Sequence, residues 1–121
     1  MNFKFDNNIP IYIQLVEYLK NYIISGKFSP GERLLSVREL ALQSKVNPNT
    51  MQRALSELES LGLVYTERTS GRFVTTDKEL INKYKEEYAK DMAEKFFLSM
   101  EGIGFNKDES IDYLLKLGGK E

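Results

Sequence analysis

Two helix-start signals follow each other closely between residues 36 and 48, and they constrain the fold more than any other feature of the chain. Ser36 and Glu39 have the spacing of a capping box, in which the two side chains satisfy free N–H groups at a helix start. Asn47-Pro48 supplies a second N-cap, followed by proline at the first helical position. We therefore expect a short helix over residues 37–44 and, after a very short turn, another helix that Gly62 ends.

An amphipathic helix is predicted ahead of this pair. Apolar residues recur at four-residue steps from Ile11 to Ile23 and define one buried face. Pro10 suits the first turn of this helix, and Gly26 suits its end. Residues 27–35 contain Pro30-Gly31 and are expected to form a turn.

A hairpin and two more helices are predicted after the pair. Residues 63–67 and 72–76 are rich in strand formers and flank the turn Thr69-Ser70-Gly71, which indicates two antiparallel strands. Asp77 then precedes a long amphipathic stretch that ends at Gly102, and a final helix follows Asn106.

Three helices followed directly by a hairpin describe a winged helix-turn-helix. The expected fold is mainly α with a small β-hairpin. We predict a winged-helix DNA-binding domain over residues 1–76 and a two-helix dimerisation tail over residues 77–121.

The composition excludes several kinds of chemistry. Because the chain has neither His nor Cys, it lacks the usual zinc ligands, a thiol nucleophile and a histidine-based triad. Adjacent acids such as Glu86-Glu87 diverge on a helix, and no phosphate-cradling glycine motif is present. We expect no enzyme, no metal and no cofactor. No apolar run approaches the ~20 residues of a membrane helix, so we expect a cytoplasmic protein without membrane contact.

Several short runs stand in a fixed order along the predicted domain. They read GKFSPGERL at residues 26–34, SVRELA at 36–41, VNPNT at 46–50 and GRFV at 71–74. Their order and spacing over residues 9–76 resemble the DNA-binding domain of GntR-type bacterial transcription regulators. The NPNT run and the opening IPIY at residues 9–12 are similar to the YtrA-like branch, whose members have a short helical tail. Two positions depart from the family's pattern. The family usually has a proline where Leu35 stands and a glycine near Ser70 in the wing tip.

The candidate DNA-binding residues lie on the helix pair and on the hairpin. A recognition helix enters the major groove by its first turns, where polar side chains reach base edges or flanking phosphates. The resemblance implies a DNA contact for Arg38. The candidates are Arg33, Ser36, Arg38, Asn47, Asn49, Thr50, Gln52 and Arg53, with Arg68, Thr69, Ser70, Gly71 and Arg72 in the wing. Helix capping is the favoured explanation of Asn47 and explains Ser36 equally well. Solvated surface charges are the alternative for the others.

Charge is unevenly distributed along the chain. The overall balance is 17 basic against 18 acidic residues, but all five arginines lie between residues 33 and 72. Residues 33–76 carry a net charge of +2 from six basic and four acidic side chains, and residues 78–121 carry −2 from eight and ten. Near-neutrality therefore does not argue against DNA binding. The small positive charge predicts weak, salt-dependent binding by one protomer and a need for two half-sites.

The amphipathic tail predicts self-association. A domain of this size has little surface with which to cover so long an apolar stripe. The proposed contact residues are Tyr84, Tyr88, Met92, Phe96, Phe97, Met100, Leu114 and Leu115. Packing onto the chain's own first helix is the alternative. The question of a small-molecule effector stays open, although the tail has no evident pocket with converging polar groups.

The sequence therefore predicts a sequence-specific DNA-binding transcription regulator. We expect a repressor that binds a palindromic operator on double-stranded DNA as a homodimer, and the YtrA-like resemblance implies a transporter operon as the target. The alternative is a winged-helix protein-protein interaction module without DNA binding. The polar start of the helix at residue 48 disfavours it, since a docking face is expected to have an apolar centre.

Overall fold

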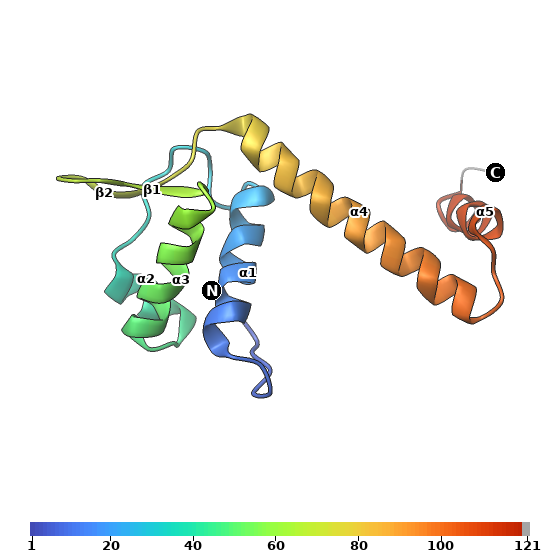
Figure 1. The fold of residues 1–121 in the computed structure, drawn as a ribbon, viewed down its shortest axis with the longest axis horizontal. Helices are drawn as coiled ribbons and strands as arrows, with labels where there is room; N and C mark the ends of the chain where they lie inside the picture. The colour runs from blue at the N-terminus through green and yellow to red at the C-terminus, as the bar shows by residue number, and fades with distance from the viewer. Residues whose placement is uncertain (120–121) are drawn as a thin grey trace. The chain divides into compact units, whose positions relative to one another are not determined.

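The computed structural model describes residues 1–119 and contains five helices and one hairpin. In chain order the elements are α1 (Ile11–Ile24), α2 (Val37–Ser44), α3 (Pro48–Ser60), β1 (Val64–Glu67), β2 (Gly71–Val74), α4 (Lys78–Gly102) and α5 (Lys107–Leu117) (Figure 1). The mainly α fold with a small hairpin is confirmed. The chain forms two compact units, Met1–Tyr84 and a second one that begins at Lys85.

The core of the first unit lies around α3, which packs against α1, α2 and β1. Its apolar stripe, which includes Met51, Leu55 and Leu58, is at most 1% exposed. Side chains of α1 cover this stripe, together with Leu40 of α2 and the strand residues Val64 and Val74. Complete burial of a Leu or Met side chain stabilises a fold by about 1.5–3 kcal/mol, so this stripe holds the three helices together.

The hairpin is antiparallel, with Val64 opposite Val74 and Thr66 opposite Arg72. Its strands are shorter than predicted, and Gly71 begins β2 instead of ending the turn. Gly71 has a φ of 110°, a conformation that L residues with a side chain rarely adopt. The departure at Ser70 is thereby accommodated, because the neighbouring glycine provides the positive φ at the wing tip.

The prediction of a simple turn over residues 27–35 was wrong for its second half. The N–H of Gly31 donates to the Val74 carbonyl and that of Leu34 to the Arg72 carbonyl, both at 2.9 Å, and Arg33 lies opposite Phe73. An unpaired edge of β2 exposes N–H and C=O groups that a neighbouring extended segment can satisfy. Residues 31–34 therefore add a short third segment to the hairpin.

The start of α2 differs in one detail from the predicted capping box. The Ser36 hydroxyl accepts the N–H of Glu39 at 3.1 Å and donates to the Glu39 carboxylate at 3.0 Å. A hydroxyl can accept and donate at once, so the two side chains bond to each other and the carboxylate does not reach the Ser36 N–H. The complete reciprocal box occurs at α5, between Asn106 and Glu109. Leu35 is exposed and does not prevent Ser36 from capping α2.

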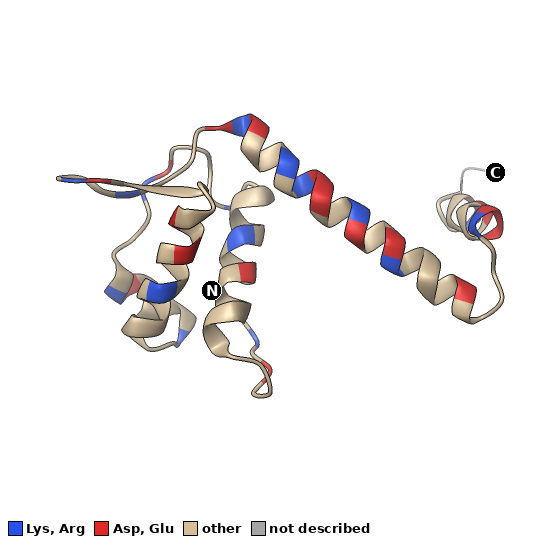
Figure 2. Cartoon of the chain, in the orientation of Figure 1, with Lys and Arg blue, Asp and Glu red and all other residues tan. Residues whose placement is uncertain are grey.

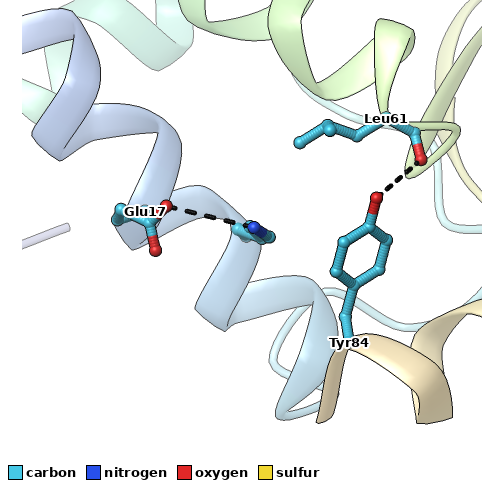
Figure 3. A network of polar contacts seen from close by, with 4 residues as sticks. Glu17, Leu61 and Tyr84 are labelled. Atoms are coloured by element: carbon cyan, nitrogen blue, oxygen red, sulfur yellow. Dashed lines mark hydrogen bonds and ion pairs between the residues drawn. The ribbon is translucent and has the colours of Figure 1, made fainter. Parts of the chain in front are cut away.

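The first two turns of α4 belong to the winged-helix unit. Ile81 is 8% exposed, and the Tyr84 hydroxyl donates to the Leu61 carbonyl at 3.3 Å (Figure 3). The Lys20 ammonium lies 4.8 Å from the centre of the Tyr84 ring, and the same group lies 4.0 Å from the Glu17 carboxylate. Tyr84, which we predicted as a dimerisation residue, thus packs on its own domain. The compact unit also extends to Tyr84, past the boundary predicted after residue 76, because these side chains anchor it.

The second unit is a pair of helices joined by a short loop. Ser110 is completely buried, and its hydroxyl donates to the Asn106 carbonyl at 2.8 Å. Phe105 meets Tyr113 edge to face, with ring centres 6.0 Å apart. Over residues 1–119, none of the helices has the length and apolar character that crossing a membrane requires.

Gly62 provides a test of how α3 is joined to β1. It has a φ of 79°, and a Cβ added there would lie 3.2 Å from the Leu80 side chain. Gly62→Ala is expected to lower the free energy of unfolding by about 1–2 kcal/mol, because alanine is strained at positive φ and would crowd Leu80. Urea unfolding followed by circular dichroism measures this. Gly102→Ala, at an open helical position without positive φ, is the control and should leave stability equal or higher. Equal stability of wild type and Gly62→Ala would contradict the expectation.

Candidate nucleic-acid interface

The start of α3 presents a polar face to solvent. Met51, Ala54 and Leu55 point into the core, whereas Asn49, Gln52 and Arg53 are exposed and Thr50 is half-buried. The Asn47 side chain accepts the N–H of Asn49 at 2.7 Å, so it caps the helix, as favoured from the sequence. The Gln52 amide donates to the Ser56 hydroxyl at 3.2 Å.

Arg38 lies on the neighbouring helix. It is exposed in the first turn of α2, one turn or less from the capping residue Ser36. The free N–H groups of a helix start favour anions, and an exposed guanidinium beside them adds a full positive charge. This end of α2 is therefore suited to a phosphate.

A groove of about 630 Å³ runs between the start of α2 and the hairpin. Residues 33–37 and Glu39 form one side and the wing, residues 66–72, forms the other. Of the predicted residues it brings together Arg33, Ser36, Arg68, Thr69, Ser70, Gly71 and Arg72. Arg38, Asn47 and Gln52 do not line it.

The two strand-borne arginines lie on opposite faces of the hairpin. Directly paired residues share a face, so Arg33 lies with Phe73 and Tyr65, whereas Arg72 lies with Thr66 on the other side. A Cβ on Gly71 would lie 3.3 Å from the Arg33 Nε, so the absence of a side chain there leaves room for this guanidinium. The Nε of Arg72 is buried without a hydrogen-bond partner.

Within residues 1–119, none of the five arginines forms an ion pair. The ion pair of this part of the chain joins Lys20 and Glu17, both on α1. Figure 2 shows basic residues on α2, on α3 and along the hairpin, with acidic residues on each of these elements too, and both signs of charge along α4. Five unpaired guanidinium groups gathered in one domain are the electrostatic arrangement expected of a surface that binds phosphates.

One residue of this surface was missed by the sequence reasoning. The guanidinium carbon of Arg53 lies 3.6 Å from the centre of the Tyr12 ring, at the start of α1. Both residues line a groove of about 290 Å³ with Ile11, Asn49 and Thr50. The available signal was that Tyr12 lies on the same helical face as Val16 and Leu19, which are buried in the core. The sequence alone does not show that the packing of α1 on α3 places it beside Arg53.

The comparisons with known proteins agree with this arrangement. Residues 11–74 match the family model described as bacterial regulatory proteins, gntR family. The chain is 37% identical over 112 residues to the uncharacterized HTH-type transcriptional regulator YhcF of Bacillus subtilis, covering 93% of each chain. It is 39% identical over 69 residues to the HTH-type transcriptional repressor YtrA of the same organism, covering 57% of this chain and 53% of YtrA.

Solved structures show the same fold. A GntR family transcriptional regulator from Listeria monocytogenes superposes with a TM-score of 0.83 at 42% identity, covering 93% of this chain and 98% of that one. The DNA-binding domain of AraR, solved in complex with operator ORR3, superposes with a TM-score of 0.52 at 31% identity, covering 62% of this chain and 88% of that one.

The family match spans more than half of the chain and lies within the winged-helix unit. The likeness to YhcF and to the Listeria regulator also extends over the helical tail. The chain therefore belongs to the gntR family of bacterial regulatory proteins, as a DNA-binding transcription regulator and not an enzyme.

Proposed function

We propose that this chain is a repressor that binds a palindromic operator as a homodimer. The observation that carries the proposal is the exposed polar start of α3, in a domain whose five arginines form no ion pair with any described residue. The AraR domain, whose fold is similar, is solved on operator DNA, and YtrA is named a repressor. Occupying a promoter operator would block transcription, and we propose a transporter operon as the target, as the resemblance to the YtrA-like branch implies.

Each part of the surface has a role in this proposal. The first turns of α3 enter the major groove, where Asn49 and Gln52 are able to pair with adenine. Arg38 at the start of α2 contacts a phosphate and sets the position of the domain. The wing reaches the minor groove, whose negative potential favours Arg68 and Arg72. Docking onto another protein fits less well, because the exposed face of α3 lacks an apolar centre.

A second copy is proposed as the partner of the tail. Exposed apolar side chains of the second unit include Met92 (65%), Leu98 (67%), Ile103 (72%), Leu114 (47%) and Leu115 (45%). Tyr88, Phe96, Phe97 and Met100, also predicted as contacts, are half-buried within the chain. A unit of roughly 40 residues without disulfides or metal buries too little surface to be stable alone. A two-fold pairing would cover this surface and set the distance between two α3 helices.

The first prediction concerns DNA recognition. The full chain is expected to select a palindromic duplex from a random-sequence library. Arg38→Ala and Gln52→Ala should each weaken binding to that duplex by about tenfold or more, since a lost phosphate or base contact costs about 1–3 kcal/mol. Fluorescence anisotropy at several salt concentrations measures the affinity.

Lys83→Ala is the matched control for this experiment. Lys83 is an exposed cation on α4 in the same unit and is not part of α2, α3 or the wing, so its removal should leave the affinity near that of wild type. If wild type formed no salt-sensitive complex, or if both variants bound as wild type does, the proposed DNA recognition would be refuted.

The second prediction concerns assembly. Wild type is expected to sediment as a dimer at micromolar concentration. Met92→Asp combined with Leu115→Asp should sediment as a monomer, because two carboxylates would be buried without partners in each half of the interface. The monomer should also lose at least about tenfold in affinity for the selected duplex, because two monomers then bind the two half-sites of the duplex independently.

Lys90→Asp separates the loss of apolar contact from a simple change of charge. Lys90 and Met92 are two residues apart on α4 and do not face the same way. This control should remain dimeric. A monomeric wild type at micromolar concentration would exclude the tail-mediated dimer.

A further inference from the structure

Arg53 has an available partner on its own helix that it does not use. Glu57 follows it by four residues on α3, a spacing at which oppositely charged side chains meet on a helix surface. Both residues are exposed, yet among the described residues Arg53 forms no ion pair. Its guanidinium lies over the Tyr12 ring at 3.6 Å instead.

Tyr12 borders two grooves, one with Arg53 and the other with Glu57. The ring borders the groove that Arg53 shares with Asn49 and Thr50, and it also borders a separate groove of about 240 Å³ that contains Glu57. Of these two grooves, Arg53 lines the former and Glu57 the latter. The stacked ring therefore holds the guanidinium on the side of the DNA-binding candidates.

Stacking leaves the guanidinium able to bind a phosphate. A cation over an aromatic ring uses the face of the guanidinium plane, while its five N–H donors point outward within that plane. Because the fork is held in one orientation, less side-chain freedom is lost when it meets a phosphate. An ion pair with Glu57 would instead use these donors and cancel the charge.

We propose that Tyr12 is a positioning residue that holds Arg53 away from Glu57 and directs its guanidinium at a DNA phosphate. This inference rests on the proposed DNA-binding function. It extends the recognition surface from α2, α3 and the wing to the start of α1. It also assigns Arg53 to backbone contact, so its effect should be similar on all DNA sequences.

The test compares Tyr12→Leu with Tyr12→Phe in the full chain. Leucine retains apolar bulk against α3 but removes the ring face, whereas phenylalanine retains the ring face and removes only the hydroxyl. Two duplexes are used: the one selected from the random-sequence library and a random-sequence duplex of the same length. Tyr12→Leu should weaken binding to both duplexes by about threefold to tenfold. The slope of log K against log salt should become shallower by about one, the change expected for one lost phosphate contact.

Tyr12→Phe should bind both duplexes as wild type does. In the Tyr12→Leu background, Glu57→Gln should restore most of the lost affinity, because the competing carboxylate is gone. Tyr12→Leu should cost nothing further in an Arg53→Ala background, since the two residues act through one contact. In NMR spectra of the free protein, the Arg53 Nε–H signal should show a ring-current shift that Tyr12→Leu removes and Tyr12→Phe keeps.

Each contrary result has a distinct meaning. Wild type that binds neither duplex overturns the proposed function and this inference together. The positioning role alone is overturned if Tyr12→Leu binds both duplexes as tightly as wild type does. It is also overturned if Tyr12→Leu weakens binding as much in the Arg53→Ala background as in the wild-type background. Equal loss in Tyr12→Phe and Tyr12→Leu would assign the contact to the phenol hydroxyl and also overturn the role of the ring. Urea unfolding of each variant identifies any loss that comes from a destabilised fold.

Discussion

The burial of one side of α3 underlies every other feature of the winged-helix unit. Met51, Leu55 and Leu58 are packed under α1, α2 and the hairpin, so the helix is held from three directions. A helix with one apolar stripe has a defined opposite face, and here that face is polar at its start. The same packing that stabilises the domain therefore also determines which side chains face solvent and are available for recognition.

The position of the charged groups depends on this framework. The chain turns at Gly62 from α3 into β1, and β2 follows. Residues 31–34 pair with β2, and this pairing places Arg33 on the hairpin instead of in a free loop. No arginine forms an ion pair with a carboxylate of the described residues, and the proposed role of the Tyr12 ring is to hold Arg53 away from Glu57. Exposed surface ion pairs contribute little to stability, so the fold loses little by leaving these guanidiniums unpaired. They remain available to an external anion.

Local chemistry in the sequence was sufficient to predict the helices and the hairpin. Pro10, Ser36 and Asn47-Pro48 correctly located three helix starts, because capping involves only residues close in the chain. The pairing of residues 31–34 was not predicted, since that segment satisfies its hydrogen bonds with residues about forty positions away. For the same reason Tyr84 was assigned to the dimer stripe: its spacing on α4 fits that stripe, but its hydroxyl bonds to Leu61.

The sequence by itself determined the order of the elements, the polar character of the α3 start and the concentration of arginine between residues 33 and 72. These properties depend on neighbouring residues and on periodicity. Only the tertiary structure decided the partners of individual side chains: Tyr12 beside Arg53, Gly71 beside Arg33, and Tyr84 on the winged-helix unit. The physical reason is that the direction of a long side chain depends on what the packed elements place next to it, and that neighbour is distant in the chain.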